Sequence, residues 1–131
     1  MSSSHTPLEI VNRFFALTEP KGGPIPDLLP SIRDMLTEDF VFIGPLMKTE
    51  GREPYVGLLG QFLQAHVGYR FHRQFVAGDD VCSIYDMTVR TPAGGTLTLT
   101  IADWLTLRVG RLCRQQLYYD PRAFAAAFGL G

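Results

Sequence analysis

The chain has 131 residues, 46% of them hydrophobic, which is enough for one domain over residues 1–131 that buries its own core. A formal net charge of −1 gives no electrostatic case for binding nucleic acid or an anionic membrane surface. No run of about 18 apolar residues could span a bilayer, and the start of the chain lacks the basic and apolar parts of a signal peptide.

The first half of the chain is predicted to be mostly helical. Thr6 and Glu9 are spaced as a capping box that starts a helix, and the proline- and glycine-rich segment 20–26 ends it. Asp27 is expected to cap the second helix. The expected order is helix, helix, strand, polar loop and helix, over residues 7–19, 27–36, 40–43, 48–51 and 52–66.

The second half alternates between apolar and polar residues, which is typical of strands with one buried face. Short turns separate the strands, so they should form an antiparallel meander. A closing helix, capped by Asp120 and ended by Gly129, is expected after them. The predicted strands and the helix cover residues 69–77, 81–90, 96–109, 112–119 and 122–128. The helices must fold onto one face of a single curved sheet.

Asp103 interrupts the apolar face of the strand 96–109. The other odd positions from 97 to 109 carry leucine, isoleucine or valine. A carboxylate among them is costly to ionise unless it is paired or hydrogen-bonded. Either a bulge or a neighbouring strand satisfies Asp103 structurally, or the apolar face lines a cavity in which Asp103 is the working polar group.

The order of elements resembles the nuclear transport factor 2-like superfamily, the cone-shaped fold shared by SnoaL-like proteins and ketosteroid isomerase. Four segments carry the resemblance and span nearly the whole chain: Leu36-Thr-Glu-Asp-Phe-Val-Phe, Glu50-Gly-Arg-Glu-Pro, Ala102-Asp-Trp-Leu-Thr-Leu-Arg-Val-Gly-Arg and Leu117-Tyr-Tyr-Asp-Pro. The resemblance implies an α+β fold with a curved, mostly antiparallel sheet and three N-terminal helices packed on its concave face, enclosing a pocket. It says less about activity, because one fold supports many functions.

Two enzymes of this superfamily have residue sets that the chain lacks. Asp103 matches the protonated aspartic acid of ketosteroid isomerase, but the base of that enzyme falls at Gly44 and its first-helix tyrosine at Phe14. Limonene epoxide hydrolases would have an arginine two residues before Asp103, where this chain has Ile101. Neither steroid isomerisation nor epoxide hydrolysis is therefore expected.

SnoaL-like cyclases use an acid/base aspartate in an apolar pocket, a role that Asp103 could fill. The residues expected to bind a small apolar substrate beside it are Phe14, Leu59, Tyr85, Met87, Ile101, Gln115, Leu117 and Tyr119. Arg73 also has the presumed inward parity and would, if paired with Asp103, turn the acid into a structural ion pair. The alternative is a pocket without catalysis, which binds a ligand or only supports a dimer.

The remaining polar residues are expected to be structural. His66 is interpreted as a helix cap, and His72 and Asp86 as facing outward. No spacing suggests a metal site, and no cofactor is expected. Cys82 and Cys113 are expected to be buried, reduced thiols of a cytoplasmic protein.

The outward-facing residues of the strand 96–109 suggest a contact surface. Its small or β-branched residues surround one tryptophan: Thr98, Thr100, Ala102, Trp104 and Thr106. Relatives with this fold commonly pair through such a face. A homodimer with Trp104 as its anchor is therefore expected.

Overall fold

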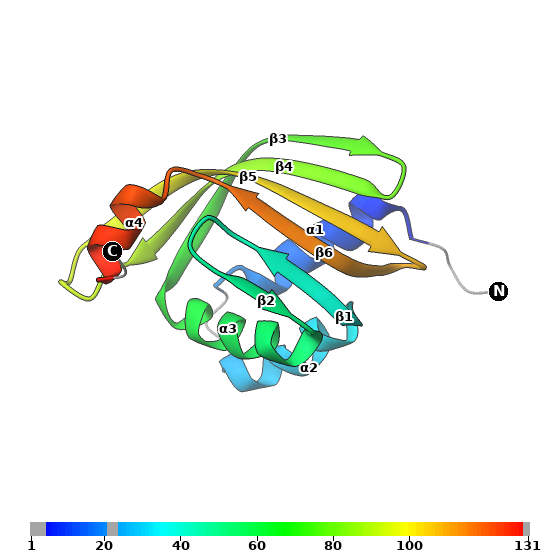
Figure 1. The fold of residues 1–131 in the computed structure, drawn as a ribbon, viewed down its shortest axis with the longest axis horizontal. Helices are drawn as coiled ribbons and strands as arrows, with labels where there is room; N and C mark the ends of the chain where they lie inside the picture. The colour runs from blue at the N-terminus through cyan, green and yellow to red at the C-terminus, as the bar shows by residue number, and fades with distance from the viewer. Residues whose placement is uncertain (1–4, 21–23, 130–131) are drawn as a thin grey trace.

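The computed structural model describes residues 5–20 and 24–129. Within these ranges, four helices and six strands follow one another as α1 (Pro7–Thr18), α2 (Ile25–Asp34), β1 (Leu36–Ile43), β2 (Lys48–Glu50), α3 (Arg52–Ala65), β3 (His66–Ala77), β4 (Asp80–Arg90), β5 (Thr96–Arg108), β6 (Arg111–Tyr118) and α4 (Pro121–Phe128). The strands form one sheet in the order β2-β1-β6-β5-β4-β3 (Figure 1). Of the strand pairs in the described residues, only β1 and β6 run in parallel, so the predicted mostly antiparallel sheet is confirmed.

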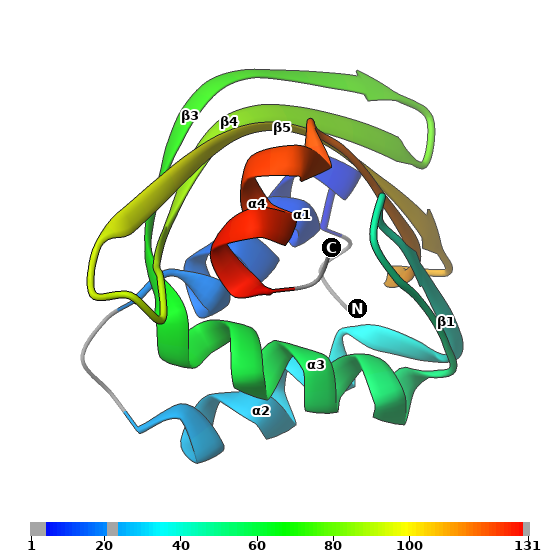
Figure 2. The ribbon, with the colours of Figure 1, turned by 60° about the vertical axis from the view of Figure 1, so that its left-hand side comes forward.

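The sheet curves strongly and its concave side holds helices (Figure 2). Helix α1 lies within the concavity against β4, and α3 crosses the open side while contacting β1. Helix α2 packs mainly on α3 and also contacts β1, so one of the three N-terminal helices lies largely outside the concavity. The fourth helix, α4, lies across one end of the hollow (Figure 2).

The predicted elements are present, with shifted boundaries. The capping box of Thr6 and Glu9 begins α1 as expected. Helix α2 starts two residues before Asp27, which makes no cap, because proline at the first turn already suits a helix start. The break before it lies partly outside the described residues, at 21–23.

One strand was predicted too short, and one strand was predicted as a loop. β1 begins at Leu36, four residues early, because Leu36 pairs with Leu112 of β6 across the parallel edge. The polar loop expected at 48–51 contains β2, a short edge strand paired with residues 41–43. Each of these extents is set by pairing with another strand, β6 for the start of β1 and β1 for β2. Hydrophobic periodicity within a segment does not indicate such pairing.

The core lies between the concave face of the sheet and the helices. Its fully enclosed members come from α1, α2, β1, β4, β5 and β6: Val11, Ile32, Leu36, Phe40, Val81, Ile101, Leu105 and Leu112. Cys82 and Cys113 are free thiols, as predicted, but only half buried. None of the helices in the described part of the chain is long and apolar enough to cross a membrane.

Candidate functional site

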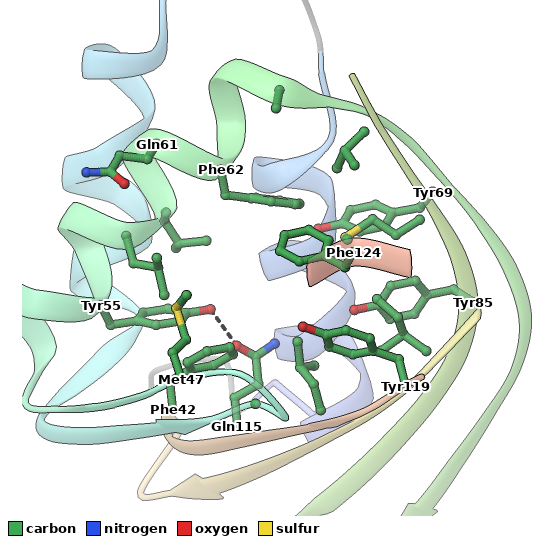
Figure 3. A pocket seen from close by; sticks show the side chains of 18 of the residues that line it. Phe42, Met47, Tyr55, Gln61, Phe62, Tyr69, Tyr85, Gln115, Tyr119 and Phe124 are labelled. Atoms are coloured by element: carbon green, nitrogen blue, oxygen red, sulfur yellow. Dashed lines mark hydrogen bonds between the residues drawn. The ribbon is translucent and has the colours of Figure 1, made fainter. Parts of the chain in front are cut away.

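A cavity of about 350 Å³ lies between the sheet and helices α1, α3 and α4 (Figure 3). Its volume is at the lower end of the range of about 300–1,000 Å³ that is usual for small-molecule sites. The eight residues that the sequence proposed for substrate binding all line it: Phe14, Leu59, Tyr85, Met87, Ile101, Gln115, Leu117 and Tyr119. Alternation along the strands predicted the inward face of the strand residues, and the apolar stripes of the helices predicted that of Phe14 and Leu59.

Asp103 lies directly behind this cavity and is completely buried. Two residues that line the cavity cover its carboxyl group. Tyr85 Oη donates a hydrogen bond to Asp103 Oδ2 at 2.7 Å, and Gln115 Nε2 donates to the same oxygen at 2.9 Å. Gln115 Oε1 in turn accepts a hydrogen bond of 2.5 Å from Tyr55 Oη (Figure 3). The carboxyl group of Asp103 is therefore linked to the cavity by hydrogen bonds with the Gln115 amide and the Tyr85 hydroxyl group, and it does not face the cavity itself.

The surroundings of Asp103 raise the pKa of its carboxyl group. Burial raises the pKa of the Asp103 carboxyl to about 7, while the hydrogen bonds from Tyr85 and Gln115 oppose this shift. Within the described residues, Asp103 Oδ1 is buried and has no hydrogen-bond partner. Such an atom favours the uncharged acid, because a buried ion needs more partners than a neutral group. The carboxyl group can therefore gain or lose a proton close to neutral pH.

The rest of the lining is apolar and mostly aromatic. Among the described residues that form it, no side chain carries a formal charge. Gly44 and Phe14, which occupy the base and tyrosine positions of ketosteroid isomerase, both line the cavity. A Cβ atom at Gly44 would lie 3.3 Å from the ring of Phe42, so that ring takes the room that a longer side chain would need.

Several cavity residues were missed by the sequence reasoning. They come from β1, the β1–β2 turn, β3, α3 and α4 and include Phe42, Met47, Tyr55, Phe62, Tyr69, Phe124 and Phe128. The apolar stripe of α3 indicated that Tyr55 and Phe62 are inward-facing. Nothing in the sequence indicated that the Tyr55 hydroxyl group would meet Gln115.

Arg73 does not pair with Asp103, so the structural ion pair that the sequence left open is not formed among the described residues. Strand β3 contains a bulge between Phe71 and Arg73, after which Arg73 pairs with Ile84, a residue of the outer face. A one-residue bulge moves the following side chains to the opposite face of a sheet. The guanidinium group of Arg73 instead lies 6.0 Å from the centre of the Phe75 ring.

The predicted structural roles of four polar residues are confirmed: His66, His72, Asp86 and Asp120. His66 is the C-cap residue of α3, with its ring buried and Nδ1 2.8 Å from the carbonyl oxygen of Thr18. His72 Nε2 lies 3.0 Å from Asp86 Oδ2, away from the cavity. Asp120 caps α4 by accepting from the backbone N–H of Arg122. The described residues contain no group of three metal-ligating side chains.

Trp104 lies on the opposite face of β5 from the cavity. Its indole Nε1 donates to Asp80 Oδ1 at 2.9 Å, and the guanidinium carbon of Arg114 lies 4.7 Å from its ring centre. The ring is therefore half buried beneath Arg114, whereas the sequence suggested an exposed tryptophan.

Comparison with known proteins gives one family and many similar structures. The SnoaL-like domain matches residues 26–115, and no curated protein matches the chain. A nuclear transport factor 2-like protein of unknown function from Cytophaga hutchinsonii is 27% identical, with a TM-score of 0.77 and coverage of 95% of this chain and 98% of the other.

Two further structures share the fold at lower identity. A proposed SnoaL-like polyketide cyclase from Jannaschia is 17% identical, with a TM-score of 0.75 over 99% of both chains. The protein TerC, co-crystallised with polyporic acid, is 19% identical, with a TM-score of 0.74 over 93% of this chain and 98% of that one. At these identities the likeness shows a shared fold and nothing more.

Proposed function

Because this chain belongs to the SnoaL-like domain family, matched over residues 26–115, we propose that it binds a small apolar carbonyl compound and transfers protons to and from it. The chemistry is that of a cyclase or isomerase centred on Asp103, with Tyr85 as the group that contacts the substrate. One observation carries the proposal: an acid with a pKa of about 7 is sealed behind a tyrosine that lines an apolar cavity.

Two hydrogen arrangements follow from the contact between Tyr85 and Asp103. When Asp103 is ionised, the Tyr85 hydroxyl group donates to it and offers the cavity only lone pairs. When Asp103 is protonated on Oδ2, it can donate to Tyr85 Oη, and the tyrosine O–H is then free to donate to a substrate oxygen. A carbonyl oxygen in the cavity favours the second arrangement, which polarises the carbonyl group and can deliver a proton to it.

The uncharged lining restricts the kind of substrate. No carboxylate, histidine or lysine among the described lining residues can remove a proton from carbon directly. A substrate with its own acidic C–H, such as a β-diketone that is partly enolised at neutral pH, needs no stronger base. This consideration favours ring closure over isomerisation of a simple ketone.

The proton balance of such a ring closure is complete without a cofactor. The enol carbon of the substrate bonds to the carbon of a second carbonyl group, whose π electrons move to its oxygen. That oxygen takes the Tyr85 proton, and Tyr85 takes the Asp103 proton. The enol O–H gives up its proton as it becomes a ketone, and this proton restores Asp103 through Tyr85.

A short triketone tests the proposal. In the compound, a β-diketone lies two methylene groups from a third ketone, so its acidic carbon can close a five-membered ring. The new hydroxyl group then leaves as water with the remaining hydrogen of that carbon. Wild-type protein should accelerate the closure, followed by NMR, over the rate in buffer. Tyr85→Phe and Asp103→Asn should each lose most of the acceleration, and Tyr118→Phe, on the outer face, should retain it.

The outcomes separate the two function classes. Equal acceleration by the wild type, Tyr85→Phe and Asp103→Asn would remove Asp103 and Tyr85 from the chemistry. Binding of the triketone without any acceleration would support the alternative of a non-catalytic ligand-binding domain.

A further inference from the structure

Four tyrosines line the cavity, and they differ in what their hydroxyl groups already do. Tyr55 donates to Gln115, and Tyr85 donates to Asp103. The Tyr69 and Thr18 hydroxyl oxygens lie 2.7 Å apart. The fourth, Tyr119, makes no hydrogen bond within the described residues, and its hydroxyl group points toward the interior of the cavity (Figure 3).

The direction of the Thr18–Tyr69 bond follows from the neighbours of Thr18. Thr18 Oγ1 lies 3.1 Å from the carbonyl oxygen of Phe14 and 3.2 Å from that of Phe15. Carbonyl oxygens only accept, so the single threonine hydrogen belongs to them. Tyr69 must then donate to Thr18. Three of the four cavity phenols therefore use their only hydrogen inside the protein.

Tyr119 is built differently from the other three. It follows the last strand and leads into α4, and its ring contacts the edge of Phe124, with centroids 6.2 Å apart. Burial raises the pKa of its hydroxyl group, so the group remains a neutral donor at physiological pH. Its oxygen is not among the fully buried, unpartnered polar atoms of the described residues, so it keeps some accessible surface. Because the hydroxyl group points into the cavity (Figure 3), a ligand there can contact it.

We propose that Tyr119 is the specificity-determining donor of the cavity and selects ligands that place an oxygen acceptor beside the start of α4. The inference deepens the proposed function and rests on it. The ligand that it describes is an uncharged, ring-containing molecule with at least one carbonyl or ether oxygen. Tyr119 adds a fixed donor to the one that Tyr85 gains only when Asp103 is protonated.

A pair of probes with one carbon frame isolates this donor. 2-Tetralone carries a carbonyl oxygen and tetralin does not. Their dissociation constants can be measured by chemical-shift titration at pH 8, where Asp103 is mostly ionised and Tyr85 is committed to it. The wild type should prefer tetralone, and Tyr119→Phe should reduce that preference by about threefold to tenfold, the value of one hydrogen bond.

Two controls accompany the titration. Tyr118→Phe alters the neighbouring residue, which pairs with Ala102 on the outer face and is half exposed, and it should leave the preference unchanged. In the wild type, the ¹³C resonance of the Tyr119 ring carbon that bears the hydroxyl group should shift with tetralone and not with tetralin. This second readout needs no variant to fold.

The possible results distinguish a failure of the Tyr119 role from a failure of the proposed function. An unchanged preference in Tyr119→Phe, or an unmoved Tyr119 resonance with bound tetralone, would overturn the role of Tyr119 and leave the proposed function intact. If neither probe binds the wild type at millimolar concentration, the proposed function fails and the inference fails with it.

Discussion

Tyr85 and Asp103 lie on neighbouring strands two residues out of register, with Tyr85 opposite Ile101 and Asp103 opposite Ser83. Because both side chains point to the inner face, the hydroxyl group of one reaches diagonally to the carboxyl group of the other, 2.7 Å away. Together with the contact from Gln115, the diagonal contact leaves Asp103 without any exposed surface. The tyrosine lies at the cavity wall, so it separates the acid from any ligand while remaining able to exchange a proton with both.

The first prediction concerns the pH dependence of stability. The pKa of Asp103 is about 7 in the folded protein and ordinarily 3.8, so the folded state holds this proton more tightly than the unfolded chain does. Stability from this group is therefore fully present below about pH 4 and is lost as the pH rises to about 7. The total loss should be roughly 4 kcal/mol in the free energy of unfolding.

Urea denaturation of the wild type and Asp103→Asn at several pH values measures this loss. The asparagine cannot titrate, so the difference between the two free energies of unfolding should change steeply between about pH 4 and pH 7 and become flat above it. A constant difference over the whole range would mean that Asp103 keeps an ordinary pKa.

The second prediction concerns ligand affinity. A ketone probe should bind best when Asp103 is protonated, because only then does Tyr85 have a free O–H. The dissociation constant should be flat below about pH 7 and rise above it, by about tenfold once Asp103 is fully ionised. Titrations of 2-tetralone from pH 6 to pH 9 check this, and Tyr85→Phe should remove the pH dependence. A wild-type affinity independent of pH would contradict the relay.

The third prediction separates binding from stability in α4. None of the described residues of α4 is fully buried, yet Phe124 and Phe128 stack with centroids 4.6 Å apart and line the cavity. Phe128→Ala should therefore cost little stability, roughly 1 kcal/mol or less, while weakening the binding of 2-tetralone several-fold. Thermal unfolding and titration measure the two effects. Phe75→Ala, which removes an exposed ring outside the cavity, should change neither the affinity nor its pH dependence.

The fourth prediction concerns the turn between β5 and β6. Val109 has a φ of 50° and its successor Gly110 a φ of 77°, the pattern of a two-residue hairpin that favours asparagine followed by glycine. A β-branched residue is strained there. Val109→Asn should therefore raise the free energy of unfolding by roughly 1 kcal/mol. The same substitution at Val76, an exposed strand position, should lower it, so a loss of stability at both sites would refute the explanation.

The fifth prediction concerns self-association, which the sequence suggests and the single chain does not test. If two copies pair through the outer faces of their sheets, Trp104 is the natural anchor. Trp104→Ala should then weaken the dimer by about 2 kcal/mol or roughly thirtyfold, as measured by light scattering over a range of concentrations. Phe124→Ala, on the cavity side, should leave the mass unchanged. A monomeric wild type would exclude the surface as an interface.

Much of the site could be predicted because strand periodicity is local. Alternation alone placed Asp103, Tyr85 and Gln115 on one face, and the register of β4, β5 and β6 then brought the three together. The capping box at Thr6 likewise needs only four residues in sequence.

What could not be predicted depends on tertiary contacts. The bulge in β3 reverses the face of Arg73, and no change in its residue pattern marks the reversal. Tyr55 belongs to α3, and its contact with Gln115 exists only once that helix crosses the open side of the sheet. The parallel pairing of Leu36 with Leu112 joins segments 76 residues apart, well beyond the reach of any local signal.

The placement of Trp104 has a practical consequence for ligand screening. It is the sole tryptophan in the sequence, and its indole lies on the convex side, between Asp80 and Arg114. Intrinsic fluorescence excited at the indole band will therefore respond poorly to a compound that enters the hollow, and will respond directly to anything that touches the convex side. Tryptophan emission that does not change when a compound is added is therefore no evidence against binding in the cavity. Emission that changes with protein concentration indicates self-association.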